Sequence, residues 1–80
     1  MKKYYIMKVN RESKTFEFLQ LVRAYDMNLA KSVAMAKYRK EIKDSNIEIT
    51  VITQSTYRAA FDHGMIVDKN GKVQTVGRNL

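Results

Sequence analysis

The sequence lacks cysteine and proline altogether and contains a single histidine. Without cysteine, the chain can form neither a disulfide nor a thiolate zinc site, and this fits a reducing, intracellular setting. All three glycines follow residue 63, so no glycine-rich phosphate-binding loop can form earlier in the chain. No apolar run approaches the roughly 18 residues that cross a bilayer. We therefore expect neither a disulfide scaffold nor a membrane span.

Signals for catalysis and export are equally scarce. Met1-Lys2-Lys3 has the charge of a secretory signal, but Lys8 interrupts the apolar stretch that should follow, so we expect a cytoplasmic protein. His63 precedes Gly64 at a predicted helix end, where a cation is favourable. Residues 68–71 resemble a calcium loop but lack its closing glutamate. We expect no catalytic residue, no metal site and no cofactor, and hence a protein that is not an enzyme.

Positive charge is what the sequence does contain. Fifteen Lys and Arg residues stand against eight Asp and Glu residues, which gives a net charge of +7. The hydrophobic content of 45% is enough for a folded core rather than a disordered basic tail. At this length we expect one domain over residues 1–80, with residues 77–80 as a loose tail. Such a charge attracts polyanions: nucleic acid, an acidic protein surface or anionic lipid.

The first part of the chain predicts a β-hairpin. Residues 4–9 are rich in strand-forming side chains, and residues 10–13 favour a turn. Residues 16–24 fit two patterns: a strand in which Val22 changes face, or a helix with Phe18, Leu21 and Val22 on one side. Asp26 or Asn28 is a good N-cap for a helix that starts afterwards, and a helix already running would not need one. We therefore expect a strand.

Residues 27–44 predict the main helix. They contain neither glycine nor proline, and apolar side chains recur at helical spacing. Small alanines in this stripe would let the helix lie close to a sheet, and residues 44–46 would end it. From the helix and the strand that follows we expect a core of Met27, Ala30, Val33, Ala34, Tyr38, Ile42, Ile49 and Val51.

The rest of the chain predicts a strand, a short helix and a hairpin. Residues 47–52 alternate cleanly, which favours a central strand. Ser55 would cap a helix over residues 56–63 that Gly64 closes, with Tyr57, Ala60 and Phe61 buried. Residues 65–76 fit a hairpin that pairs Val67 with Val73. The fold class is therefore α+β: a single antiparallel sheet with one long helix packed on one face, in the order β-β-α-β-(short α)-β-β.

Two groups of cations are candidate nucleic-acid-binding residues. The outer face of the predicted helix carries Lys37, Arg39, Lys40 and Lys43, without a carboxylate to neutralise them. The second group surrounds the first hairpin. One of its two adjacent tyrosines must point away from a helix that covers one face, and a tyrosine among lysines suits base stacking and phosphate contact. This group comprises Lys2, Lys3, Tyr4, Tyr5 and Lys8, with Arg11 and Lys14 nearby.

Both groups also have ordinary structural explanations. The helix face can be a solvated surface whose cations are favoured near the C-terminus. The lysines of the hairpin can protect an edge strand against aggregation. No known RNA-binding module or helix-turn-helix fits the order of elements. Nucleic-acid binding would therefore rest on backbone and stacking contacts, with little readout of base identity.

Three segments resemble small bacteriophage proteins: residues 4–9 (YYIMKV), 22–34 (VRAYDMNLAKSVA) and 47–51 (IEITV). They are similar to compact anti-CRISPR proteins, and in size and basicity the chain resembles early host-takeover proteins of T-even-type coliphages. Some of those neutralise toxin–antitoxin defences and bind RNA. The resemblance implies a phage accessory or counter-defence factor that acts in the host cytoplasm, and it assigns no functional residue.

Three functions remain open on the sequence. The first is a non-catalytic nucleic-acid-binding protein, with RNA slightly favoured over DNA. The second is a stoichiometric inhibitor that docks its basic surface on an acidic or nucleic-acid-binding host protein. The third is a small structural protein that forms a homo-oligomer. None of the three requires a membrane.

Overall fold

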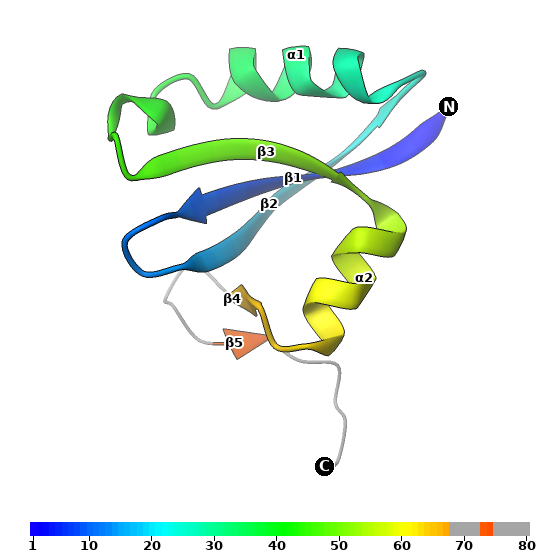
Figure 1. Ribbon diagram of the computed structural model, residues 1–80. Coiled ribbons are helices and arrows are strands. Elements are labelled where there is room, and N and C mark those ends of the chain that lie inside the picture. The colour runs from blue at the N-terminus through cyan, green and yellow to red at the C-terminus, as the bar shows by residue number, and fades with distance from the viewer. Residues whose placement is uncertain (68–72, 75–80) are drawn as a thin grey trace.

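The computed structural model describes residues 1–67 and 73–74 and confirms the α+β class (Figure 1). Within these residues an initial hairpin is followed by helices and strands in alternation as far as residue 67, and a second short strand comes last. The predicted tail at 77–80 and the turn at 68–72 lie outside the described residues. The elements are β1 (Lys2–Asn10), β2 (Thr15–Ala24), α1 (Met27–Lys37), the 3₁₀ turn η1 (Glu41–Lys43), β3 (Ile47–Thr53), α2 (Gln54–Asp62), β4 (Ile66–Val67) and β5 (Val73–Gln74).

The strands form one mixed sheet in the order β3-β1-β2-β4-β5. β1 pairs antiparallel with both β2 and β3, whereas β4 joins β2 in the parallel direction. The prediction of a purely antiparallel sheet is therefore wrong at β4. The prediction that residues 47–52 form a central strand is also wrong, because β3 is an edge strand of the described sheet. The predicted pairing of Val67 with Val73 is confirmed.

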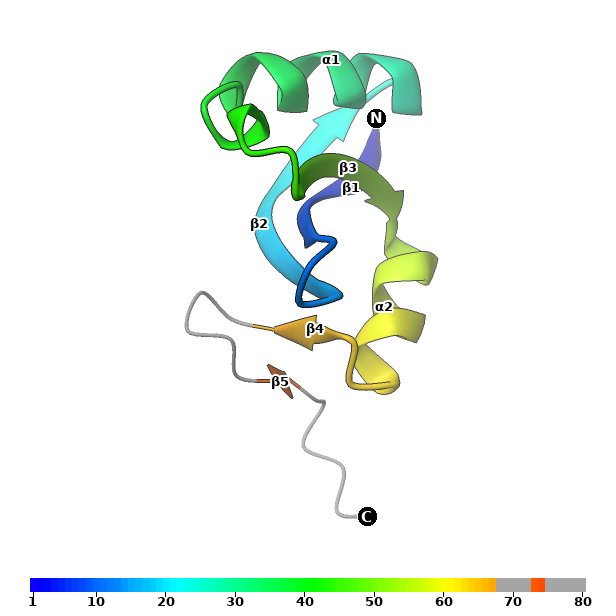
Figure 2. The same cartoon turned by 60° about the vertical axis from the view of Figure 1, so that its left-hand side comes forward.

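Helices lie on both faces of the sheet. α1 runs along one face, while α2 follows β3 directly and packs near one end of the other (Figures 1 and 2). Under α1 the core is built from Tyr4, Ile6, Ile49 and Val51 on the strands and from small side chains on or next to the helix. Ala30 and Ala34 are fully buried there, which is how α1 approaches the sheet closely, as the alanine stripe predicts.

The predicted core is only partly right. Ala30, Ala34, Ile49 and Val51 are buried, and Met27, Tyr38 and Ile42 pack against them while partly exposed. Val33 is 41% exposed, so its assignment to the core is wrong. It lies beside the Ala30–Ala34 line, at the margin of the contact between α1 and the sheet. Sequence reasoning missed the buried residues Tyr4, Ile6, Met7, Ala24 and Ile66.

α1 is shorter than predicted: it ends at Lys37 rather than at residue 44. Tyr38 is its C-cap, donates its backbone N–H to the Ala34 carbonyl at 2.9 Å, and donates its hydroxyl to Gln20 Oε1 at 3.0 Å. A continued helix would place Lys40 one turn from both Lys37 and Lys43, and like charges at that spacing destabilise a helix. The chain instead turns through η1 toward β3.

A bulge in β2 explains the ambiguous pattern of residues 16–24. Ile6 pairs with Gln20 and Met7 with Phe18, so Leu19 has no partner in β1. Because of this extra residue, Leu19 packs into the core under α1 while Phe18 and Leu21 both face the other side of the sheet. The strand prediction is confirmed, and Figure 2 shows how strongly β2 bends. The bulge also explains why apolar residues of this strand follow a helix-like spacing in the sequence, because the extra residue interrupts the regular alternation.

Side chains cap both helices. Asp26 has extended backbone angles and its Oδ1 accepts a hydrogen bond from the Leu29 backbone N–H at 2.8 Å, which confirms the predicted N-cap of α1. At α2 the N-cap is Thr53, whose hydroxyl accepts from the Thr56 N–H, and the prediction of Ser55 is two residues late. Gly64 follows α2 with a φ of 69°, the left-handed conformation expected of a helix stop.

Candidate nucleic-acid interface

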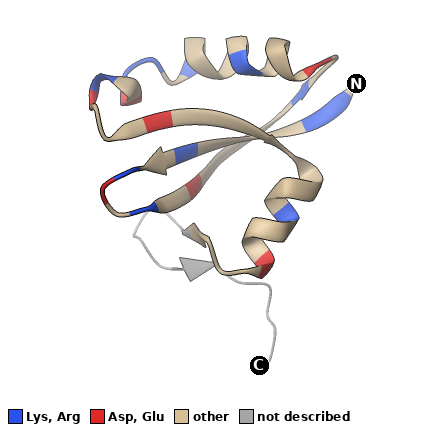
Figure 3. Cartoon of the chain, viewed as in Figure 1, with Lys and Arg blue, Asp and Glu red and all other residues tan. Residues whose placement is uncertain are grey.

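The structure divides the predicted binding residues between two ends of the molecule. β1 begins beside the start of α1, and α1 ends near the start of β3, at the far end of the sheet (Figure 1). Lys2, Lys3 and Tyr5 therefore lie at one end, and Lys37, Arg39, Lys40 and Lys43 lie at the other (Figure 3). They are two surfaces rather than one.

The two adjacent tyrosines point to opposite faces, as the strand alternation predicts. Tyr4 faces α1 and is 5% exposed, so its assignment as a binding residue is wrong: its side chain is part of the core. Tyr5 faces the other side of the sheet. There it does not stand free, because its ring stacks on Tyr57 of α2 with ring centroids 4.2 Å apart and an angle of 16° between the planes. The outward-facing tyrosine is thus held in place by a second one.

These two rings belong to a larger aromatic cluster on this face of the sheet. The ring centroid of Phe18 lies 5.6 Å from that of Tyr5 and 5.5 Å from that of Tyr57, and the centroid of Phe61 lies 5.9 Å from that of Tyr57. Phe18 is 36% exposed. Burial, and secondarily the neighbouring Tyr5, raise the pKa of Tyr57 above its ordinary value of 10.0. The Tyr57 hydroxyl therefore remains a neutral hydrogen-bonding group at physiological pH.

A shallow hollow of about 230 Å³ opens beside the stacked tyrosines. Tyr5, Tyr57 and Phe61 supply its aromatic lining, and Gln54 and Arg58 supply polar groups. An amide donates and accepts hydrogen bonds at once, and a guanidinium binds phosphate oxygens or stacks on a ring. The hollow therefore combines the groups that a nucleotide requires: flat apolar surface, hydrogen-bonding groups and a cation.

Two cations face each other next to this cluster. Lys3 pairs directly with Arg23 across β1 and β2, and side chains in direct register project on the same face. Lys3 is two residues from Tyr5, with no register shift between them, so it shares that face. Both cations are exposed, and neither forms an ion pair with a carboxylate in residues 1–67. Like charges in direct opposition repel, and an anion between them would relieve the repulsion.

We name this surface the basic–aromatic face and define it as Lys3, Tyr5, Arg23, Tyr57 and Arg58, with Phe18 and Phe61 behind the tyrosines. Sequence reasoning found only Lys3 and Tyr5. Arg23 could have been found from the hairpin register, because a short turn over residues 11–14 brings the end of β2 opposite the start of β1. Arg58 was isolated in the sequence, and only the packing of α2 on the sheet brings it to Tyr5.

The second surface, which we name the α1-exit cluster, consists of Lys37, Arg39, Lys40 and Lys43. The predicted continuous helix face does not exist, since Lys37 ends α1 and Lys43 lies in η1. The four side chains are all exposed, and none forms an ion pair among the residues that the structure describes. Glu41 lines the same hollow as Lys37, Arg39 and Lys40. The prediction that this surface has no carboxylate is therefore wrong.

The remaining hairpin cations are dispersed. Lys8 is partly buried near the hairpin end of β1, opposite Ile49 and Glu17. Arg11 Nη2 lies 2.8 Å from Glu48 Oε2 in an exposed salt bridge, so its charge is compensated. Lys14 has a φ of 57° and its role is to shape the turn. Asn10 supports this turn, because its Oδ1 accepts from the backbone N–H groups of Glu12 and Ser13.

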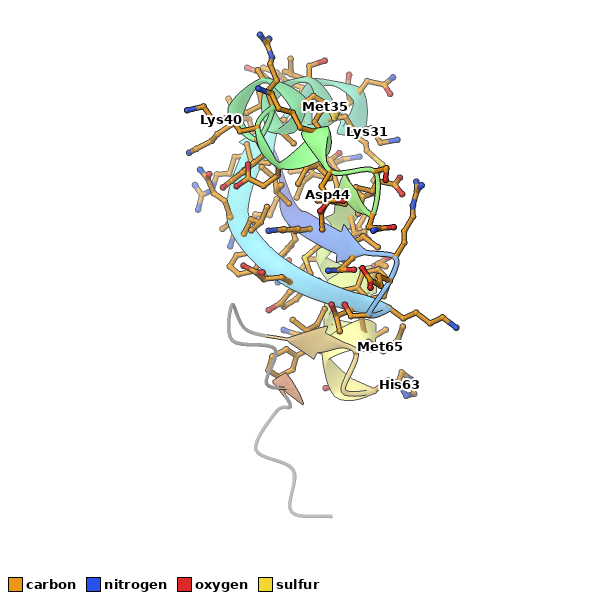
Figure 4. All side chains as sticks on the ribbon, turned by 90° about the vertical axis from the view of Figure 1, so that its left-hand side faces the viewer. Lys31, Met35, Lys40, Asp44, His63 and Met65 are labelled. Carbon is orange, nitrogen blue, oxygen red and sulfur yellow. The ribbon has the colours of Figure 1, made fainter. Side chains whose placement is uncertain are left out.

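His63 lies at the C-cap of α2, with its backbone N–H bonded to the Ala59 carbonyl at 3.1 Å. It is exposed, at the end of the molecule opposite Lys31, Met35 and Lys40 (Figure 4). Among the described residues, no three His, Asp or Glu side chains gather in a way that could hold a metal ion. Over the same residues, no helix has the length and apolar character needed to cross a bilayer.

The chain matches no protein-family model, and no significant similarity was found to a curated protein or to a solved structure. The resemblance to phage proteins therefore stays a prediction. A functional argument has to rest on the residues of this chain and on their arrangement.

Proposed function

We propose that this protein binds single-stranded nucleic acid, with RNA slightly favoured, through the basic–aromatic face. The observation that carries the proposal is the unpaired Lys3–Arg23 couple beside the stacked rings of Tyr5 and Tyr57. Binding of this kind needs no catalytic group and gives no chemical turnover.

Electrostatics supports this choice of ligand. A phosphate between Lys3 and Arg23 would meet two cations at once and remove their mutual repulsion. Arg58, which lines the same hollow as the tyrosines, would contact a further phosphate of the same strand. Several cations next to an aromatic centre suit the repeating backbone of a nucleic acid, whose phosphates alternate with bases.

The aromatic hollow favours a single strand over a duplex. Bases in a duplex are already stacked on one another, whereas an unpaired base can lie against an aromatic side chain and gain about 1–3 kcal/mol. Gln54 at the hollow offers an amide that can hydrogen-bond a ribose 2′-hydroxyl, and this group is absent from DNA. The slight preference for RNA rests on that amide.

The α1-exit cluster lies at the other end of the molecule, and the aromatic residue that lines its hollow, Tyr38, is partly buried and donates its hydroxyl to Gln20. Its cations would contact only the phosphates of a longer strand, without stacking. We expect it to add affinity for long oligonucleotides and none for short ones. Little base specificity should result from either surface, because phosphate contacts carry no sequence information.

Titration of labelled single-stranded RNA, single-stranded DNA and duplex DNA, at two or more salt concentrations, tests the proposal. With about four phosphate contacts the slope of log K against log salt should be near −3, at roughly −0.7 per contact for a single strand. Tyr5→Ala should weaken binding by about 1–3 kcal/mol if a base stacks there. Leu29→Ala is the control, since Leu29 is an exposed apolar side chain of α1, which covers the opposite face of the sheet.

Absence of binding to all three ligands at low salt would refute the proposal. The stoichiometric inhibitor, with its basic surface on an acidic host protein, would then become the leading hypothesis. A pull-down from host lysate with and without nuclease separates the two: a protein partner that survives nuclease supports the inhibitor.

A further inference from the structure

β3 is an open edge of the sheet. Over residues 1–67 and 73–74 it pairs only with β1, so the backbone N–H and C=O groups on its other side have no strand partner. Every second residue of an antiparallel edge strand directs both of these groups outward. β3 spans seven residues, which is long for an exposed edge, whereas the opposite edge, β5, has only two. Short edge strands resist pairing with other chains, and long ones favour it.

β3 carries none of the features that block such pairing. It has no lysine, no proline and no register shift against β1. Its sequence, Ile-Glu-Ile-Thr-Val-Ile-Thr, consists of β-branched residues except for Glu48. That one charge is already compensated, because Glu48 forms the salt bridge with Arg11. The lysines that could protect an edge lie instead on β1, in the interior of the sheet.

The strand is complementary to itself in the antiparallel direction. With Thr50 opposite Thr50 of a second copy, Ile49 meets Val51 on the α1 face and Glu48 meets Ile52 on the other face. No charge faces a like charge. Pairs of β-branched side chains and pairs of threonines are among the favourable cross-strand combinations. A twofold axis through Thr50 therefore pairs the whole strand with itself without opposing like charges.

The surface beside this edge also suits a second copy. A hollow between α1 and β3 is lined by Met35, Lys31 and Ala34 from the helix and by residues 48–51 from the strand. Met35 is 46% exposed there, and Figure 4 shows it on the same side as Lys31. A flexible thioether beside Ile49 and Val51 can cover the apolar side chains of an added strand.

We propose that two copies of this protein associate through their β3 strands, with Thr50 at the twofold axis, to form one continuous sheet. The interaction surface is the outer edge of β3 together with Met35. The occupant is the same strand of a second chain, and no nucleic acid takes part in the contact. The proposal is independent of the proposed function.

Sedimentation of nuclease-treated protein over a concentration series tests it. We expect a reversible monomer–dimer equilibrium within about 1–500 μM, the range of a modest interface. Thr50→Lys places two lysines against each other at the axis and should raise the dissociation constant by at least about tenfold. Thr50→Glu should do the same. Ser32→Lys, at an exposed position of α1 that does not line the hollow beside β3, adds the same charge and should leave the constant unchanged.

Mixing the two Thr50 variants distinguishes an interface effect from misfolding. The lysine introduced in one chain and the glutamate introduced in the other attract, so the 1:1 mixture should recover dimerisation although each variant alone is monomeric. Failure of the mixture to recover, with both variants folded by circular dichroism, would overturn the proposed register. A wild-type protein that stays monomeric throughout the concentration series would overturn the proposal as a whole, and β3 would then be an edge open to a different protein.

Discussion

Replacing both Lys3 and Arg23 with glutamine should weaken nucleic-acid binding and, at low salt, slightly stabilise the free protein. The two effects have opposite signs because the same pair of charges is responsible for both. In the free protein Lys3 and Arg23 face each other across β1 and β2 with no carboxylate partner in the described residues. In a complex a phosphate would lie between them.

The size of each effect follows from the geometry. Two unit charges about 7 Å apart in water repel by about 0.6 kcal/mol, and this is an upper value for side chains that can move apart. Removal of two phosphate contacts should flatten the salt dependence of binding by about 1.4 units of slope. The gain in stability should vanish near 1 M salt, where the screening length is only about 3 Å.

Urea unfolding of the free protein at about 0.01 M and about 1 M salt measures the change in stability, and RNA titration over the intervening range measures the change in binding. Lys14→Gln with Lys43→Gln, assayed with a short oligonucleotide that the α1-exit cluster does not reach, is the control. It removes the same net charge from exposed positions that do not face each other. If the control flattens the salt slope as much as the test variant does, binding follows net charge alone and the basic–aromatic face is not the site.

Three further predictions concern stability and the absence of catalysis. Asp26→Ala removes the acceptor of the Leu29 N–H and should cost about 1 kcal/mol in urea unfolding, whereas Asp26→Asn should cost much less, since asparagine caps equally well. Because burial raises the pKa of Tyr57, the folded state favours the neutral hydroxyl, and this contribution to stability is complete below pH 10 and is lost as the pH rises through the raised pKa. Phenylalanine does not ionise, so Tyr57→Phe should lose less stability than the wild type between about pH 9 and about pH 11. His63→Gln should leave RNA binding intact. A large loss of RNA binding in a folded variant would contradict the expectation that His63 takes no part in function.

Local signals predicted most of the elements. The cap at Asp26, the alternation over residues 47–52 and the glycine stop at Gly64 each depend on a few neighbouring residues, and each is where the sequence places it. The pairing of Val67 with Val73 also follows from local turn chemistry. Interactions of this kind need no knowledge of the rest of the fold.

Long-range packing accounts for what was missed. The end of α1 at Lys37 is accompanied by a hydrogen bond from Tyr38 to Gln20, which lie far apart in the sequence. The parallel pairing of β4 with β2 arises because α2 carries the chain back along the sheet before β4 begins. The edge position of β3 depends on β1 pairing on both of its sides. No periodicity in a single segment contains this information.

The candidate site shows the same division between what local patterns predict and what only tertiary packing determines. Alternation alone required one of Tyr4 and Tyr5 to face away from α1, but it could not tell which one. Nor could it show that Tyr57 would stack on the outward ring. The α1-exit cluster was predicted as one face of a helix that is too long. Its cations are in fact near one another because α1 ends at Lys37 and the chain then turns through η1. Arg23 and Arg58 entered the site only through tertiary contacts.

The two proposals have a joint consequence that follows from symmetry. A twofold axis normal to the sheet at Thr50 places both copies of α1 on one side and both basic–aromatic faces on the other. A strand of nucleic acid that reaches both faces would bind them with a high effective concentration for the second contact. Such a strand would in turn stabilise the dimer, because it binds two joined copies more tightly than two separate ones. A short oligonucleotide that fills one face gives no such coupling. The length dependence of RNA affinity should therefore be steeper in the wild-type protein than in Thr50→Lys, in which only the α1-exit cluster of the same copy adds affinity with length.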